Sequence, residues 1–268
     1  MDQLPKIAKK VRKEIIDLCY QTKSPHIGSC FSMVELLVFL YFKHLNVSAT
    51  RSMNKNRDRF ILSKGHACLA LYIVLAYKGF IPKSDLKNYC ANGGYLKHHP
   101  DRDVARGIEV TSGSLGHGLS LGVGMALAAK KDGQKHKVYV LLSDGELNEG
   151  SVWEAIMFAS HHKLDNLVAI VDYNKMQALG FTKDTINLDP LAQRWGSFGW
   201  DAKEVEGHNF YEISKVFGSM TFDTDRPTVI IAHTIKGKGV SFMENNILWH
   251  YRSPDDEEYK TIMKELGC

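Results

Sequence analysis

Two side chains that could bind a divalent cation follow two apolar runs of this sequence. Residues 137–142 and 167–171 are short and rich in β-branched residues, which is typical of buried parallel strands. Asp144 stands just after the first run and Asn174 just after the second. A carboxylate and an amide oxygen are hard donors that suit Mg2+ or Ca2+ better than zinc. Taken alone, the pair fits a metal site about as well as an ordinary turn Asp and turn Asn.

The segment between the two runs indicates how this pair is positioned. Its apolar residues recur at helical spacing, and Ser151 followed by Glu154 is typical of a capping box at the helix start. A strand–helix–strand unit has parallel strands, so Asp144 and Asn174 should both lie at carboxyl ends, where open α/β sheets bind ligands. Gly145 lets a phosphate approach the backbone. The unit therefore predicts a site for Mg2+ and a diphosphate.

The remaining pattern predicts one α/β domain over residues 1–268. Further strands are expected at residues 59–63, 200–205 and 228–232. Helical spacing predicts helices at residues 5–20, 33–45, 68–76, 119–131, 151–163, 190–198, 210–221 and 253–267. Polar segments at residues 46–58, 82–106 and 175–189 are expected to be loops. The expected fold is a doubly wound, mostly parallel sheet with helices on both faces.

Four histidines stand in segments where a ligand can approach. His26 lies in a tight loop between two helices, and His99 precedes a proline in a polar segment. His66 follows a predicted strand together with Lys64, so both are expected to point toward an anion. His250 follows a tryptophan near the end of the chain. Each of these histidines alone is equally typical of an ordinary surface position.

Composition excludes several classes of protein. The formal net charge of +4 is too small to favour a nucleic-acid partner. The sequence shows neither a signal peptide nor a membrane-spanning run, so we expect a cytoplasmic protein. Five cysteines without a CxxC pair favour free thiols in a reducing compartment. One basic cluster is expected on the solvated face of the first helix, formed by Lys9, Lys10, Arg12 and Lys13.

Five motifs together resemble the transketolase family. The string DGELNEGSVWEA with the later Asn174 resembles the thiamine-diphosphate motif, and PHIGS, LSKGHA, TSGSLGHG and KGKG with a later WH follow the order found in transketolases. The sequence departs from the family pattern at three positions. Ser143 and Tyr251 stand where the family has Gly, and Ser114 stands where it has Pro. The resemblance implies the thiamine-diphosphate-binding fold of the diphosphate-binding (PP) domain.

The resemblance also implies a set of site residues. The histidines expected to act on substrate hydroxyls are His26, His99 and His250. The expected contacts to thiamine diphosphate are Ser29, His66, Gly113, Ser114, Leu115, Gly145, Asn174, Lys236 and His250. The expected Mg2+ ligands are Asp144, Asn174 and the backbone carbonyl of Met176. Ca2+ or Mn2+ are expected to replace Mg2+ at such a site.

In functional terms, the resemblance implies the N-terminal subunit of a two-chain transketolase. A C-terminal subunit would supply the pyrimidine-binding and C-terminal domains, and the expected assembly is a heterotetramer. The pair would transfer a two-carbon ketol unit between sugars or sugar phosphates, with neither nucleic acid nor membrane as a partner. Glu149 matches a family glutamate at the subunit interface, where it either links paired sites or seals the contact.

Two alternatives to this function remain open from the sequence. One is an E1 α-type subunit of a thiamine-dependent 2-oxo-acid enzyme, although the LSKGHA string is not expected in that branch. The other is a cofactor-binding scaffold without catalysis. The choice between pentose-phosphate chemistry and a dedicated unusual-sugar pathway also stays open.

Overall fold

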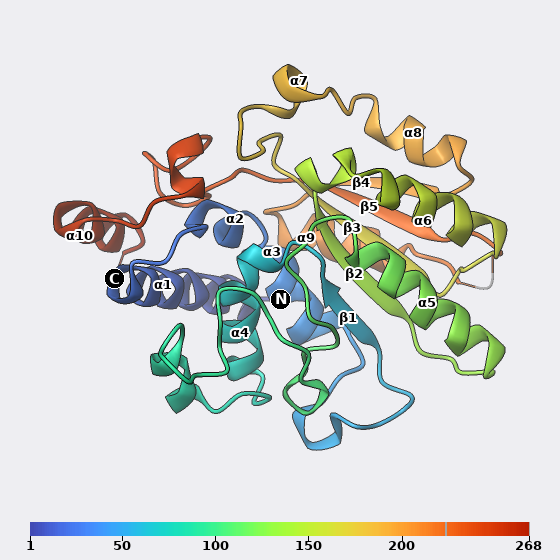
Figure 1. Cartoon of the computed structure of the whole chain (residues 1–268), viewed down its shortest axis with the longest axis horizontal. Helices are drawn as coiled ribbons and strands as arrows, with labels where there is room; N and C mark the ends of the chain where they lie inside the picture. The colour runs from blue at the N-terminus through green and yellow to red at the C-terminus, as the bar shows by residue number, and fades with distance from the viewer. Residues whose placement is uncertain (223, 268) are drawn as a thin grey trace.

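The computed structural model describes residues 1–222 and 224–267 of the chain, and its centre is a parallel sheet (Figure 1). The strands are β1 (Arg59–Leu62), β2 (Val138–Ser143), β3 (Leu167–Tyr173), β4 (Asp201–Glu206) and β5 (Thr228–His233). They lie in the order β1-β2-β3-β5-β4, and every neighbouring pair is parallel. All five predicted strands are confirmed, with ends within two residues of those expected.

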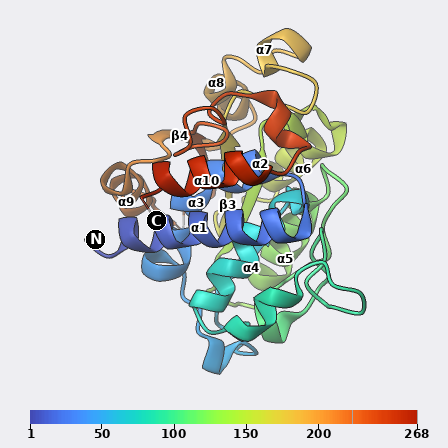
Figure 2. The ribbon, with the colours of Figure 1, turned by 90° about the vertical axis from the view of Figure 1, so that its left-hand side faces the viewer.

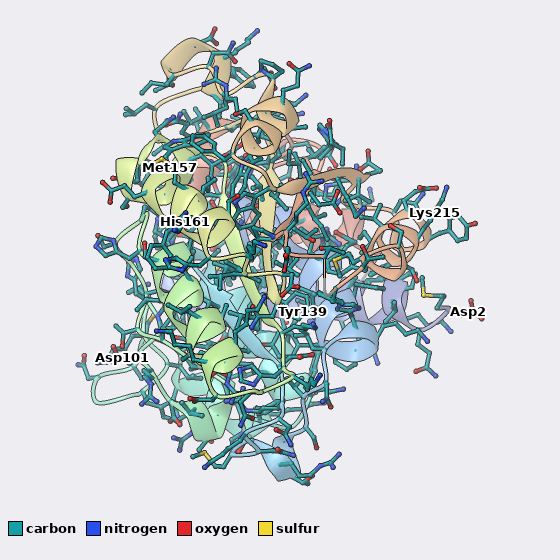
Figure 3. The ribbon with its side chains drawn as sticks, turned by 90° about the vertical axis from the view of Figure 1, so that its right-hand side faces the viewer. Asp2, Asp101, Tyr139, Met157, His161 and Lys215 are labelled. Carbon is teal, nitrogen blue, oxygen red and sulfur yellow. The ribbon has the colours of Figure 1, made fainter. Side chains whose placement is uncertain are left out.

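Helices cover both faces of the sheet, which confirms the predicted fold class (Figure 1). One face carries α1 (Leu4–Thr22), α2 (Ile27–Ser32), α3 (Val34–Phe39), α4 (Cys68–Tyr77) and α9 (Phe210–Gly218). The other carries α5 (Gly118–Lys131), α6 (Gly150–His161) and α8 (Leu191–Ser197). Figure 3 views the molecule from the side of α5 and α6, where Met157 and His161 lie on the outer surface of α6.

Strands β2, β3 and β5 and most of β1 are apolar because both of their faces are covered, whereas the edge strand β4 is mostly polar and only partly buried. In β1, Phe60 and Leu62 pack against the α1–α4 face, whereas Ile61 between them packs against the α5–α6 face. The same alternation runs through β2, β3 and β5, so two separate apolar clusters form, one on each side of the sheet. This double burial explains why β1, β2, β3 and β5 are nearly continuous apolar runs in the sequence rather than alternating ones.

The last helix, α10 (Asp256–Glu265), lies alongside α1 (Figure 2). The ring of Tyr259 stacks on that of Tyr20, with 4.3 Å between ring centroids, and its hydroxyl donates to Asp17 at 2.8 Å. A full capping box at Asp255 starts α10. The short helix α7 (Thr182–Thr185) lies within the segment that was expected to be a plain loop.

Some local predictions differ from the structure. The helix expected at residues 33–45 is α3 followed by a π-helical turn at Leu40–His44, and α2 lies before it, within the segment expected to be a tight loop. Two further predictions are wrong because a tertiary contact replaces a local one. Ser151 does not cap α6, because its hydroxyl donates instead to the carbonyl of Gly116 at 2.9 Å. Arg12 is buried rather than solvated, because its guanidinium binds Glu35.

Among the described residues, no helix is both long and apolar enough to cross a membrane. The same part of the chain contains no group of three or more His, Cys, Asp or Glu side chains able to hold a metal ion. Cys19, Cys30 and Cys68 are buried free thiols and Cys90 is a half-buried one. Cys268, the fifth cysteine of the sequence, lies outside the described residues.

Candidate functional site

A cavity of about 380 Å³ lies at the carboxyl ends of the strands and gathers nearly all of the predicted site residues. Those that line it are His26, Ser29, His66, His99, Gly113, Leu115, Asp144, Gly145, Asn174, Met176, Lys236 and His250. Ser114 is the exception, because its residue is exposed and does not line the cavity. A larger depression of about 690 Å³ follows the loop at residues 90–108 and holds none of the predicted site side chains.

The carboxylate of Asp144 is completely buried at the end of β2. One of its oxygens accepts from the backbone N–H of Gly145 at 2.7 Å, and the other accepts from that of Lys175 at 2.5 Å. Burial, together with the nearby carboxylate of Asp172, raises the pKa of Asp144 to about 7. A carboxylate in this position is costly to ionise, and a bound cation would offset that cost.

Asn174 and Met176 follow β3, and both line the same cavity. The side-chain oxygen of Asn174 accepts from the backbone N–H of Met176 at 3.1 Å, which closes a turn of the backbone. The side chain of Met176 is buried, so only its carbonyl is available to a ligand. The backbone carbonyl of Met176 accepts from Lys236 Nζ at 3.4 Å, so a positive group already approaches one predicted cation ligand.

Lys236 and Lys64 are both buried, and they have different partners. Lys236 lies beyond β5, and within the described part of the chain its ammonium has hydrogen-bonding contacts to the backbone carbonyls of Met176 and Gln177 alone. Burial lowers its pKa to about 8. Lys64 was expected to point toward an anion, but its ammonium forms an ion pair with Asp172. Of the two lysines, Lys236 is therefore the one whose charge is available to a phosphate.

Three imidazole rings form a triangle at one wall of the cavity. The ring centroids of His26 and His66 are 5.0 Å apart, those of His26 and His250 are 5.1 Å apart, and those of His66 and His250 are 5.5 Å apart. His26 has a left-handed backbone with φ of 73°, and its N–H donates to the carbonyl of His250 at 3.1 Å. This backbone conformation is strained for a residue other than glycine, and it places the His26 ring in the lining of the cavity. The hydroxyl of Ser29 lies 3.5 Å from Nδ1 of His250.

All four candidate histidines are held in the neutral state. Burial, reinforced by neighbouring histidines and Lys236, lowers the pKa of His26 to about 4. Burial and Lys236 lower the pKa of His250 to about 3. The pKa of His66 lies well below its ordinary value and that of His99 is also lowered, in both cases mainly by burial. A neutral imidazole both donates and accepts a hydrogen bond, so these rings can bind hydroxyl groups of a ligand.

A buried glutamate that the sequence did not single out joins the Gly-rich loop to the turn after β2. Glu146 accepts from the backbone N–H of Gly116 at 2.8 Å and from that of Ser143 at 3.2 Å. The hydroxyl of Ser63 also donates to it. A Cβ atom on Gly118 would stand 2.2 Å from the Ser63 hydroxyl oxygen, so only glycine allows this approach.

Gly113 and His99 lie close together in the lining of the cavity. A Cβ atom on Gly113 would lie 3.1 Å from Cδ2 of His99, so the glycine leaves room for that ring. Tyr251, which replaces the glycine of the family pattern, is another residue that the sequence did not assign to the site. Its ring packs edge-on against His250 with 4.6 Å between centroids, and it lines the cavity.

The donors present at the site fit a divalent cation and a diphosphate. One buried carboxylate, one amide oxygen and one backbone carbonyl are hard ligands of the kind that Mg2+ takes, with phosphate and water completing its shell. The ammonium of Lys236 and the backbone near Gly145 supply groups that bind a phosphate. The same cavity therefore contains groups that bind a cation and groups that bind an anion.

Comparison with known proteins gives the same assignment of the chain. Residues 4–268 match the family described as the thiamine diphosphate binding domain of transketolase. The chain is 43% identical to one of the subunits of apulose-4-phosphate transketolase from Phocaeicola vulgatus, over 97% of this chain and 92% of that protein. It is 39% identical to the SqwG subunit of 6-deoxy-6-sulfo-D-fructose transketolase from Clostridium sp., over 97% of this chain and 94% of that protein.

Solved structures agree with these relatives. The chain matches transketolase from Campylobacter jejuni with a TM-score of 0.92 and 30% identity. The match covers all of this chain but 43% of that one, so the chain spans less than half the length of the solved enzyme. The relatives named here are transketolases or transketolase subunits, which favours that family over the 2-oxo-acid alternative.

Proposed function

Because the chain belongs to the transketolase family and carries its thiamine-diphosphate-binding domain, we propose that it is the N-terminal subunit of a two-chain transketolase. The pair transfers a two-carbon ketol unit from a ketose donor to an aldose acceptor. The observation that supports this most is the cavity where neutral histidines adjoin buried Asp144, Asn174 and Lys236. We propose that residues 1–268 act as one diphosphate-binding domain.

The proposed roles of the cofactor residues follow from their chemistry. Asp144, Asn174 and the carbonyl of Met176 hold Mg2+, for which Ca2+ or Mn2+ can substitute. Lys236 and the backbone at Gly145 hold the diphosphate. Further contacts to thiamine diphosphate come from Ser29, His66, Gly113, Ser114, Leu115 and His250. When bound, thiamine diphosphate supplies an electron sink that allows a carbon–carbon bond beside a carbonyl to break.

The proposed catalytic residues are His26, His99 and His250. Their lowered pKa values keep the imidazoles neutral at pH 7, so each can donate to one sugar oxygen and accept from another. Such a ring can also take a proton from a substrate hydroxyl and return it later. His26 and His250 are in contact, so both can bind one substrate at adjacent oxygens.

We propose that a C-terminal subunit supplies the pyrimidine-binding and C-terminal domains. This is supported by the relatives named as subunits, because they have about the length of this chain. We propose a heterotetramer located in the cytoplasm, in which Glu149 lies at the subunit interface. The names of those relatives mention apulose 4-phosphate and 6-deoxy-6-sulfo-D-fructose, so we propose a sugar or sugar phosphate as the substrate.

Native mass spectrometry tests this proposal. The chain is purified from its own host with thiamine diphosphate and Mg2+, and wild type is compared with D144N and with D225N, which changes an exposed aspartate. We expect wild type and D225N to retain cofactor and a second chain, and D144N to lose the cofactor. The recovered pair should then transfer a two-carbon unit between sugars. A homo-oligomer that holds cofactor without any partner would contradict the two-chain active site.

A further inference from the structure

The buried carboxylate of Asp172 lies behind the site and has no role in the proposed chemistry. It stands near the end of β3 and is completely buried. One of its oxygens accepts from the hydroxyl of Ser32 at 2.5 Å, from the side-chain nitrogen of Asn174 at 3.3 Å and from the ammonium of Lys64. The other accepts from the hydroxyl of Thr234. Four donors from four segments therefore meet on one carboxylate.

These contacts satisfy both carboxylate oxygens of Asp172 inside the protein. The ammonium of Lys64 also donates to the carbonyl of Ser29 at 2.9 Å. A buried ion pair that is fully hydrogen-bonded in this way fixes the groups around it in one arrangement.

Each donor to Asp172 lies close in sequence to a proposed site residue. The Ser32 hydroxyl belongs to α2, which also carries Ser29, and the Lys64 ammonium comes from the segment that continues to His66. The Thr234 hydroxyl comes from the segment that continues to Lys236.

The fourth donor, Asn174, is itself a proposed cation ligand. The side-chain nitrogen of Asn174 donates to an oxygen of Asp172 at 3.3 Å, and the same oxygen also accepts from the ammonium of Lys64. The amide oxygen is then forced to the other side, where it accepts from the N–H of Met176 and Asn174 lines the cavity. An amide without such a neighbour can flip and present nitrogen instead of oxygen. Nitrogen in that position would be a donor facing a cation.

We propose that Asp172 is a positioning residue that fixes the orientation of the Asn174 amide and thereby sets the affinity of the site for a divalent cation. The inference rests on the proposed function, because it requires Asn174 to bind the cation. Asp172 acts through Asn174 and does not touch the cation itself. Thr234 and Ser32 serve the same purpose, because their hydroxyls donate to the Asp172 carboxylate and fix its rotamer.

The test measures Mg2+ affinity in the full chain, in complex with its recovered partner chain and with thiamine diphosphate in excess, by calorimetric titration and by tryptophan fluorescence. The variants are D172N, which removes the charge, and T234V, which removes one donor to it. T234S restores the hydroxyl. T228V is the matched control, because Thr228 is also buried but lies at the opposite end of β5. The thermal midpoint of each variant is measured beside its affinity.

We expect D172N to weaken Mg2+ binding by about 10- to 100-fold, the usual range for a group that orients a metal ligand. T234V should weaken it by about threefold to tenfold, and T234S should restore it. T228V should leave affinity unchanged even where its thermal midpoint falls as far as that of T234V. If D172N does not fold, the Mg2+ affinities of T234V and T234S still test the positioning role of Asp172.

Three results would overturn the inference, and they are distinguishable. If wild type binds Mg2+ and thiamine diphosphate and T234V binds Mg2+ with the same affinity, the positioning role of Asp172 is rejected and the proposed function is not. Wild type that binds neither Mg2+ nor thiamine diphosphate sinks the proposed function and this inference together. A loss of affinity in T228V equal to that in T234V also rejects the positioning role, because it would be an effect of stability.

Discussion

Replacing Glu35 with glutamine should destabilise the protein through one buried ion pair. Glu35 lies on α3 and accepts from two nitrogens of the Arg12 guanidinium, at 2.5 and 2.8 Å. It also contacts Nδ1 of His208 at 2.9 Å. The side chains of Arg12 and Glu35 are only 8% and 9% exposed. The E35Q variant keeps the shape of the side chain but leaves the charge of Arg12 buried without a counter-charge.

Two estimates of the cost agree. Removing one partner of a buried ion pair typically costs about 3 to 5 kcal/mol of stability. Burial acts to raise the pKa of Glu35, but Arg12 and His208 outweigh it and lower the pKa to about 2. An unfolded glutamate has a pKa of about 4.3, and each pKa unit is worth about 1.4 kcal/mol, so the linkage contributes about 3 kcal/mol.

The stabilisation by Glu35 should depend on pH in a definite direction. The pKa of Glu35 is lower in the folded state, so the stabilisation is fully present above the unfolded pKa of about 4.3 and is lost as pH falls toward about 2. The difference in unfolding free energy between wild type and E35Q should therefore be constant from pH 7 to about 5. It should then narrow as the pH is lowered further.

Urea denaturation followed by circular dichroism measures these free energies. The matched control is D225N, which breaks an ion pair with Lys163 in which both side chains are 62% exposed. Such an exposed pair is screened by solvent and should contribute little to stability. The reasoning is refuted if E35Q costs no more than D225N. It is also refuted if the gap between wild type and E35Q stays constant from pH 5 down to pH 3.

The same substitution should reach the cofactor site, because the network continues into the loop after β5. Nε2 of His208 accepts from the backbone N–H of Ile235 at 2.8 Å, and Arg12 donates to the carbonyl of Lys238 at 2.9 Å. These two contacts flank Lys236, the proposed diphosphate ligand. E35Q should therefore also weaken the binding of thiamine diphosphate, whereas D225N should leave it unchanged.

Three further outcomes are expected from single positions. G122A should lower the unfolding free energy by about 1 to 3 kcal/mol, because its Cβ would stand 2.4 Å from Cγ2 of Val140. G124A is the control: its Cβ meets nothing within 4 Å, so it should not destabilise the protein in the same urea titration. Mg2+ affinity should fall about tenfold per pH unit below pH 7, because the cation binds the ionised form of Asp144 and the pKa of Asp144 is about 7. Calorimetry in buffers of different ionisation enthalpy should detect the proton that Mg2+ binding releases. K236M should weaken thiamine diphosphate about 10- to 100-fold in a fluorescence titration, because a charge-assisted hydrogen bond is lost.

The features that the sequence predicted correctly are those that depend on neighbouring residues. The apolar run at residues 137–142 forms β2 because burial on both faces of a sheet demands continuous hydrophobicity. Asp144 and Asn174 line one cavity because parallel neighbouring strands end at the same edge of the sheet. Their position follows from two local patterns and one rule of handedness. No long-range contact had to be known in advance.

The features that the sequence did not predict are contacts between distant segments. Lys64 pairs with Asp172 across more than a hundred residues, and a lysine after a strand looks the same whether it faces an anion or a buried carboxylate. Arg12 belongs to a basic run typical of a solvated face, yet α3 brings Glu35 against it. Ser151 has the pattern of a cap, but the Gly-rich loop offers its hydroxyl another acceptor. Only the fold decides among such partners.

The electrostatics of the cavity explain why a cation and a diphosphate would bind there together. Asp144 and Lys236 are both buried, and their pKa values of about 7 and about 8 have moved toward each other. Each group is therefore poorly stabilised in its charged form. A cation bound at Asp144 would lower the pKa of that carboxyl, and a diphosphate near Lys236 would raise the pKa of the ammonium. Because Mg2+ also binds the diphosphate, each ligand improves the site for the other, so their binding should be mutually dependent.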